Sequence, residues 1–224
     1  ERHIAYYVHI GRWIKNPEIL REILFVWLPN GDVLWAQSFG RGDCSRGPWA
    51  ACERLICEEP GKKIRIVYNG PMQLIPLAKV ATPDPAPTNL DMVSLDILFE
   101  GKSPTWYYPQ TENTTWSKWH TEQLGNGKGT IKHVDKTYHF DGVAYRDHSR
   151  GPRYLEHFRG HTWIQAHFPE GDSLALYQMW QVVDGVEKEA LSEATIYKDG
   201  EFHEAKVIYS PRMLSTSNIV CDYQ

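Results

Sequence analysis

The residues best suited to acid–base chemistry lie mainly in the second half of the chain. Eight of the ten histidines follow residue 118, and imidazole is the side chain that exchanges protons most readily near neutral pH. The densest polar stretch, residues 145–153, follows a strand-like segment and contains a Gly-Pro turn. Alternate residues of an extended segment point to opposite faces, so Asp147 and His148 are neighbours that face different sides.

Asp147 is the candidate general acid and base of this stretch. If the end of its strand faces a cavity, enclosure by aromatic side chains removes water from the carboxyl group and raises its pKa, so that it keeps a proton near neutral pH. A close arginine, such as Arg146, Arg150 or Arg153, would oppose that rise. The alternative is a network of aspartate and arginine that only closes the end of a barrel.

A second cluster contains His120 and Glu122, which share one face of an extended strand. This spacing suits an acid–base pair or two ligands of a metal ion. No set of three ligands has a convincing metal-binding spacing, so we expect no metal. A metal-dependent enzyme that uses His120 and Glu122 is the weakest of the hypotheses.

Aromatic and polar side chains that could surround a substrate follow the same segments. The residues from His161 to His167 place His161, Trp163, Gln165 and His167 on one face of a strand, which could line a wet cavity or face solvent. The candidate site is therefore Asp147 as the acid and base, with His148, His120 and Glu122 to orient it or relay its proton. The predicted pocket walls are Tyr145, Trp163 and Trp180, with His161 and Arg146 as further contacts to the substrate.

The elements that must position these residues read as β-strands. Residues 90–100 alternate between apolar and polar side chains, as in a sheet with one buried face. The Asn-Gly pair at residues 30–31 predicts a tight hairpin. The only helical candidates are short, near residues 17–20 and 186–193. A polar, proline-containing break at residues 103–118 separates two β-rich halves, so the sequence predicts an all-β protein with domains at residues 1–110 and 111–224.

Composition excludes several classes of protein. The chain has 224 residues, 42% of them hydrophobic and 23% charged, which is an ordinary globular balance. No apolar run is long enough for a membrane helix, and the net charge of −4 disfavours a nucleic-acid partner. The sequence contains no G-x-G-x-x-G, Walker A or G-x-S-x-G motif, which disfavours nucleotide-dependent enzymes and α/β-hydrolases. The four cysteines show no metal-binding spacing, so we expect reduced thiols and a cytoplasmic protein, with no signal peptide visible.

One stretch of the chain resembles a known family. Residues 120–178 are similar to the hydroxyneurosporene synthase/AttH superfamily, which includes carotenoid 1,2-hydratases and decalin-forming Diels–Alderases. Residues 21–39 and 90–106 match its N-terminal part loosely. One departure is Arg150, which stands where the family usually has Trp. The resemblance lies in Glu122-Gln123, Gly129-Thr130, Phe140-Asp141-Gly142, Tyr145-Arg146-Asp147-His148-Ser149, Gly151-Pro152-Arg153 and Gly160-His161-Thr162-Trp163.

The resemblance implies two tandem lipocalin-like antiparallel β-barrel or sandwich halves. It also implies an enzyme that needs no cofactor and that hydrates, isomerises or cyclises a hydrophobic molecule of isoprenoid, steroid or polyketide type. Carried over to this chain, the acid of the family motif is Asp147. The alternative is a carrier that uses the same pocket without catalysis, because fold alone does not determine function. The sequence leaves the substrate and the oligomeric state open.

Overall fold

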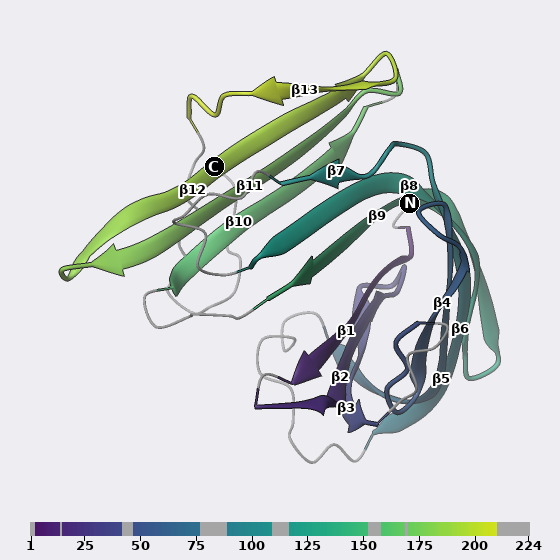
Figure 1. Ribbon diagram of the computed structural model, residues 1–224. Helices are drawn as coiled ribbons and strands as arrows, with labels where there is room; N and C mark the ends of the chain where they lie inside the picture. The colour runs from purple at the N-terminus through teal and green to yellow at the C-terminus, as the bar shows by residue number, and fades with distance from the viewer. Residues whose placement is uncertain are drawn as a thin grey trace. The chain divides into compact units, whose positions relative to one another are not determined.

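A computed structural model describes residues 3–13, 15–41, 47–76, 89–108, 117–151, 158–168 and 170–209. Every regular element in these ranges is a β-strand, which confirms the predicted fold class (Figure 1). The described residues contain no helix with the length and apolar composition that a membrane crossing requires. Cys52 and Cys57 are free thiols, whereas Cys44 and Cys221 lie outside the described residues.

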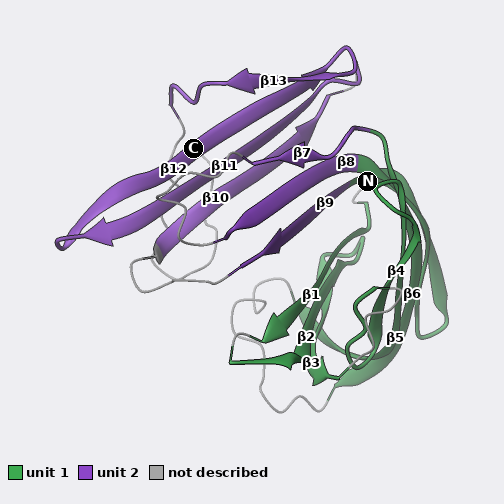
Figure 2. Cartoon of the chain, viewed as in Figure 1, with its two compact units in different colours: residues 1–102, 125–144 green, residues 103–124, 145–224 purple. Residues whose placement is uncertain are grey.

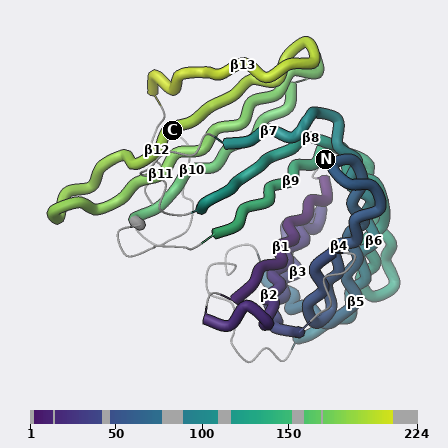
Figure 3. Tube along the Cα trace, viewed as in Figure 1, coloured from purple at the N-terminus to yellow at the C-terminus, as the bar shows by residue number. Residues whose placement is uncertain are grey.

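The chain forms two compact units, and it passes between them more than once (Figure 2). Unit 1 contains residues 1–102 and 125–144, and unit 2 contains residues 103–124 and 145–224. The sequence predicts one boundary near residue 110. The structure instead returns the hairpin of residues 125–144 to unit 1, because the long strands β8 and β9 run through both units (Figure 3).

Unit 1 is built on an antiparallel sheet whose inner face is a continuous apolar core. In β6 the inward residues Val93, Leu95, Ile97 and Phe99 are all buried, which is the alternation expected from the sequence. The predicted hairpin is present, since the Leu28 backbone N–H donates to the Asp32 carbonyl at 2.9 Å. The strands of unit 1 are β1 (Ala5–Trp13), β2 (Asn16–Trp27), β3 (Asp32–Gly40), β4 (Glu53–Glu59), β5 (Lys63–Pro76), β6 (Leu90–Gly101) and the adjoining parts of β8 (Trp119–His133) and β9 (Lys136–Arg150).

Unit 2 combines a second sheet with the remaining parts of β8 and β9. Its four-stranded sheet has the order β10-β11-β12-β13, all antiparallel. A small aromatic core packs Tyr108, Tyr177 and Met179 against Trp106 and Trp163. This core holds the candidate site. The remaining strands of unit 2 are β7 (Trp106–Tyr107), β10 (Phe158–His167), β11 (Ser173–Val183), β12 (Val186–Lys198) and β13 (Glu201–Ala205).

Both short helical predictions are wrong. Residues 17–20 lie in β2 and residues 186–193 lie in β12. Residues 186–193 pair with β11, and Leu20 of the first segment pairs with β1 and β3. The turn before β12 is Asp184-Gly185, with φ of 54° and 73°, a left-handed pair that suits a two-residue hairpin. Tertiary pairing therefore overrides the local helical preference.

Candidate active site

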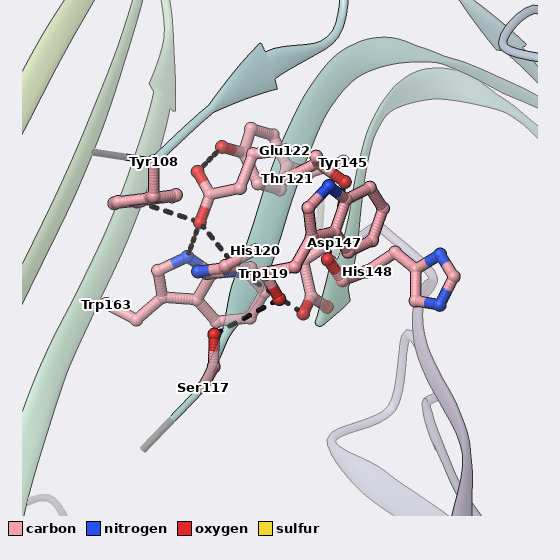
Figure 4. Close-up of polar contacts among 10 residues, drawn as sticks. All are labelled: Tyr108, Ser117, Trp119, His120, Thr121, Glu122, Tyr145, Asp147, His148 and Trp163. Carbon is pink, nitrogen blue, oxygen red and sulfur yellow. Dashed lines mark hydrogen bonds and ion pairs between the residues drawn. The ribbon is translucent and has the colours of Figure 1, made fainter. Parts of the chain in front are cut away.

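Glu122 is the centre of the polar network in unit 2. It lies in β8, is only 1% exposed, and receives three hydrogen bonds (Figure 4). Its Oε1 accepts from the Tyr108 hydroxyl at 2.9 Å and from Trp163 Nε1 at 2.8 Å. Its Oε2 accepts from the Tyr145 hydroxyl. Three elements, β8, β9 and β10, and the residue after β7 thus converge on one carboxyl group.

Burial dominates the electrostatics of Glu122. Removal from water raises the pKa of its carboxyl from 4.5 to about 8, against the opposing hydrogen bonds from Trp163 and Tyr108. The negative charge of Asp147 raises this pKa further. When protonated, Glu122 can donate from Oε2 to the oxygen of Tyr145, and when ionised it can accept from all three donors. The network can therefore satisfy both protonation states, as a group that transfers a proton requires.

His120 lies between Glu122 and Asp147. Its ring is buried and stacks on Tyr108, with centroids 4.4 Å apart and planes 5° apart. Its Nε2 is 3.7 Å from Glu122 Oε1 and 3.5 Å from Asp147 Oδ2. The Asp147 side chain is 41% exposed. His120 therefore lies between the partly exposed carboxyl of Asp147 and the buried carboxyl of Glu122 (Figure 4).

His148 and Arg146 lie outside this network. As the strand alternation predicts, the His148 ring points away from Glu122 (Figure 4) and meets Trp119 edge-on, with centroids 4.9 Å apart. Partial burial lowers the pKa of His148, and the charge of Arg146 adds to this effect. Arg146 donates from Nη1 to Gln123 Oε1 at 3.1 Å. The structure therefore places both residues away from the hydrogen bonds of Glu122.

The strand β10 contributes the aromatic and histidine side chains expected from the sequence. Trp163 reaches Glu122, and His161 stacks on Tyr177, with centroids 5.6 Å apart. Partial burial lowers the pKa of both His161 and His167. On this face Trp163, Gln165 and His167 are half-buried, whereas His161 is exposed. Trp180 lies in β11, partly buried, and is not among the described residues that line the pocket beside Glu122.

A narrow pocket opens beside Glu122. The volume in it that water could fill is about 10 Å³, room for about one water molecule and far below the range of about 300–1,000 Å³ typical of ligand pockets. Besides Glu122, its walls include Trp106, Tyr145, Ala175, Thr195, Tyr197 and Phe202.

Unit 1 buries a pair of carboxyl groups, Glu22 and Glu53, which are far in the sequence from the candidate site. Glu22 accepts hydrogen bonds from Ser38 Oγ and from the backbone N–H groups of Cys52 and Glu53, the last two at 2.9 and 2.8 Å. The carboxyl oxygens of Glu53 have no hydrogen-bond partner among the described residues. Burial, helped by the charge of Glu22, raises the pKa of Glu53 to about 8. Glu53 is therefore a matched comparison for Glu122.

Sequence reasoning included Glu122 but assigned it a supporting role, and it did not include Tyr108. The only sequence signal for Tyr108 is its place in the aromatic run of residues 106–108. In the part of the chain that the structure describes, no group of three or more His, Cys, Asp or Glu side chains is arranged to hold a metal ion. The absence of a cofactor stays a prediction.

The comparisons with known proteins define the fold family. The protein-family model described as "Domain of unknown function (DUF7064)" matches residues 45–209, so the chain belongs to that family. A crystal structure of a candidate AttH protein from Nitrosomonas europaea has the same fold, with a TM-score of 0.56 and 15% sequence identity. The match covers 90% of this chain and 61% of that one, so this chain spans about three fifths of its neighbour's length. No curated protein matches the sequence. The protein therefore has an AttH-like, lipocalin-like β-fold.

Proposed function

We propose that the protein is an enzyme that uses acid–base chemistry without a cofactor on a hydrophobic small molecule of isoprenoid, steroid or polyketide type. The reaction is a hydration, an isomerisation or a cyclisation. One observation carries the proposal: Glu122 is a buried carboxyl group with a raised pKa, and it borders a pocket with aromatic walls. A carrier has no need of such a group at its pocket.

In this proposal Glu122 is the general acid. Its Oε2 proton moves to an alkene carbon of the substrate, which leaves a carbocation on the neighbouring carbon and a carboxylate on Glu122. The rings of Trp106, Tyr197 and Phe202 line the pocket, and aromatic faces stabilise a cation by their quadrupole. The hydrogen bonds of Tyr108, Tyr145 and Trp163 stabilise the carboxylate.

The fate of the cation decides the reaction. Addition of water and loss of one of its protons completes a hydration, loss of a proton from the next carbon completes an isomerisation, and attack by a second double bond followed by proton loss completes a cyclisation. In each case the released proton restores Glu122, directly or through His120 and Asp147. The sequence-based hypothesis made Asp147 the acid. We assign that role to Glu122 because it is buried, whereas the Asp147 side chain is 41% exposed.

Turnover in D₂O tests this proposal. A panel of isoprenoids, steroids and unsaturated polyketides is incubated with the protein, and mass spectrometry detects added water or deuterium bound to carbon. We expect Glu122→Gln to lose about 10²–10⁴-fold in rate, the range for a positioned acid. Asp147→Asn loses less, because it acts through His120. The matched control is Glu53→Gln, a buried glutamate of unit 1, which keeps full activity.

Two results would overturn the assignment. Full turnover in Glu122→Gln removes the acid role from this residue. Saturable binding of a panel compound without deuterium uptake or conversion makes the protein a carrier. Circular dichroism on each variant separates a loss of chemistry from a loss of fold.

A further inference from the structure

Unit 1 has an opening at one end of its apolar core. The opening lies between two hairpin turns, the turn of residues 29–32 that joins β2 to β3 and the turn of residues 134–135 that joins β8 to β9. Its floor consists of Leu28, which is 5% exposed, with Leu74 and Tyr138, both of which pack against the core. The volume in it that water could fill is about 220 Å³. This is below the range of about 300–1,000 Å³ for drug-sized ligands, so the space suits a small one.

The rim of this pocket is polar and carries an excess of negative charge. Asp32 and Asp135 supply two carboxylates, and Lys136 supplies one ammonium group. Asp32 Oδ2 accepts a hydrogen bond from Asn30 Nδ2 at 2.7 Å, which fixes its position. His133 also lines the pocket, but it is occupied by an ion pair of 2.9 Å with Asp91. The charges at the mouth therefore favour a cationic group over an anionic one.

The turn of residues 134–135, beside the pocket, has an unusual sequence for its backbone conformation. Val134 has a φ of 55° and is 72% exposed. A β-branched residue in this left-handed region is strained. The hairpin turns at residues 184–185 and 199–200 also begin with a residue of positive φ, but there it is an Asp followed by Gly, a pair that adopts such turns readily. The strained position at residue 134 thus presents an apolar side chain at the pocket mouth, where an apolar ligand would cover it.

We propose that unit 1 carries a second ligand site at this mouth, for a small apolar amine. Its apolar body lies on Leu28, Leu74 and Tyr138, and its ammonium group lies at the carboxylates of Asp32 and Asp135. The site shares no residue with the pocket beside Glu122. It stands independently of the acid–base function proposed for unit 2.

Binding of two amphiphiles of opposite charge tests the proposal. Decylammonium and decanoate have the same chain length, and each is titrated below its micellar concentration into protein with labelled methyl groups. We expect decylammonium to shift the methyl signals of Leu28, Leu74 and Val134 saturably, with decanoate binding more weakly. Asp135→Asn should weaken decylammonium binding by about three- to five-fold, the effect of one exposed ion pair. The matched control, Lys136→Gln, should strengthen it.

Both substitutions lie at exposed positions outside the core, and unchanged methyl signals elsewhere in unit 1 verify the fold. The proposal is overturned if decylammonium causes no saturable shift at these three residues. It is also overturned if decanoate binds as tightly, or if Asp135→Asn and Lys136→Gln change the affinity in the same direction. Shifts confined to methyl groups of unit 2 would equally exclude the site.

Discussion

Replacing Glu122 by glutamine should make the stability of unit 2 less dependent on pH. Glutamine has nearly the same shape, and its amide oxygen can accept from Tyr108 and Trp163 while its amide N–H donates to Tyr145. The substitution therefore keeps the network and removes the titration. The pKa of Glu122 is about 8 in the folded protein, against 4.5 for an ordinary glutamate.

The size of the effect follows from proton linkage. Between pH 4.5 and pH 8 the folded state holds one more proton than the unfolded state at Glu122, so stability falls as pH rises. The slope is about 1.4 kcal/mol per pH unit. From about pH 5 to about pH 8, wild-type unit 2 should lose on the order of 4 kcal/mol relative to Glu122→Gln. The full contribution is present below pH 4.5 and is gone once pH has risen through about 8.

Native-state hydrogen exchange on the amides of β10 and β11 reports on unit 2 separately. The comparison must be between wild type and variant, because the lowered pKa values of His148, His161 and His167 make stability fall with acid in both proteins. If the difference between the two proteins is flat from pH 5 to pH 9, the carboxylate is ionised throughout. The three hydrogen bonds would then outweigh burial, and Glu122 could not be the proton donor.

Three further predictions concern other positions. Glu53→Gln should remove the corresponding fall in the stability of unit 1 as pH rises toward about 8, measured by exchange of β5 amides, because the pKa of Glu53 is raised in the same way. Trp163→Phe removes a hydrogen-bond donor that lowers the pKa of Glu122, so the fall in the stability of unit 2 should occur at higher pH. If the pH of this fall is unchanged, the Trp163 hydrogen bond does not set the pKa of Glu122. Val134→Gly should raise the stability of unit 1 by about 1 kcal/mol in urea denaturation, since glycine adopts a positive φ without strain, and a loss would show that the valine side chain packs productively.

Much of the fold was predictable because it depends on local pattern. The alternation of residues 90–100 and the Asn-Gly turn at residues 30–31 determine which face is buried and where a hairpin closes. The segments at residues 17–20 and 186–193 were wrongly predicted because their local composition was weighed without their hairpin partners, β1 and β11. The Asp184-Gly185 turn before residue 186 is the sequence signal that favours a strand there.

The sequence identified several residues of the candidate site, but it did not identify the role of each. Strand alternation correctly put His120 with Glu122 and separated Asp147 from His148. It could not show that β10 brings Trp163 to Glu122, or that Tyr108 does the same, because these contacts join residues 41 and 14 positions apart. Which carboxyl is buried depends on these contacts, so only the structure shows that Glu122 is the more buried of the two.

Because the chain passes from unit 1 to unit 2 and back again, the protein cannot be divided into its units at one position in the sequence. A fragment that ends at residue 102 keeps β6 but lacks its partner β8, which pairs with it from Val93↔His133 to Gly101↔Gly125. The unpaired backbone of β6 would then form an open sheet edge, a template for aggregation. Recombination between relatives would have to exchange the hairpin of residues 125–144 together with the N-terminal segment. Because each unit consists of two separate segments of the chain, no single cut in the gene separates one unit from the other.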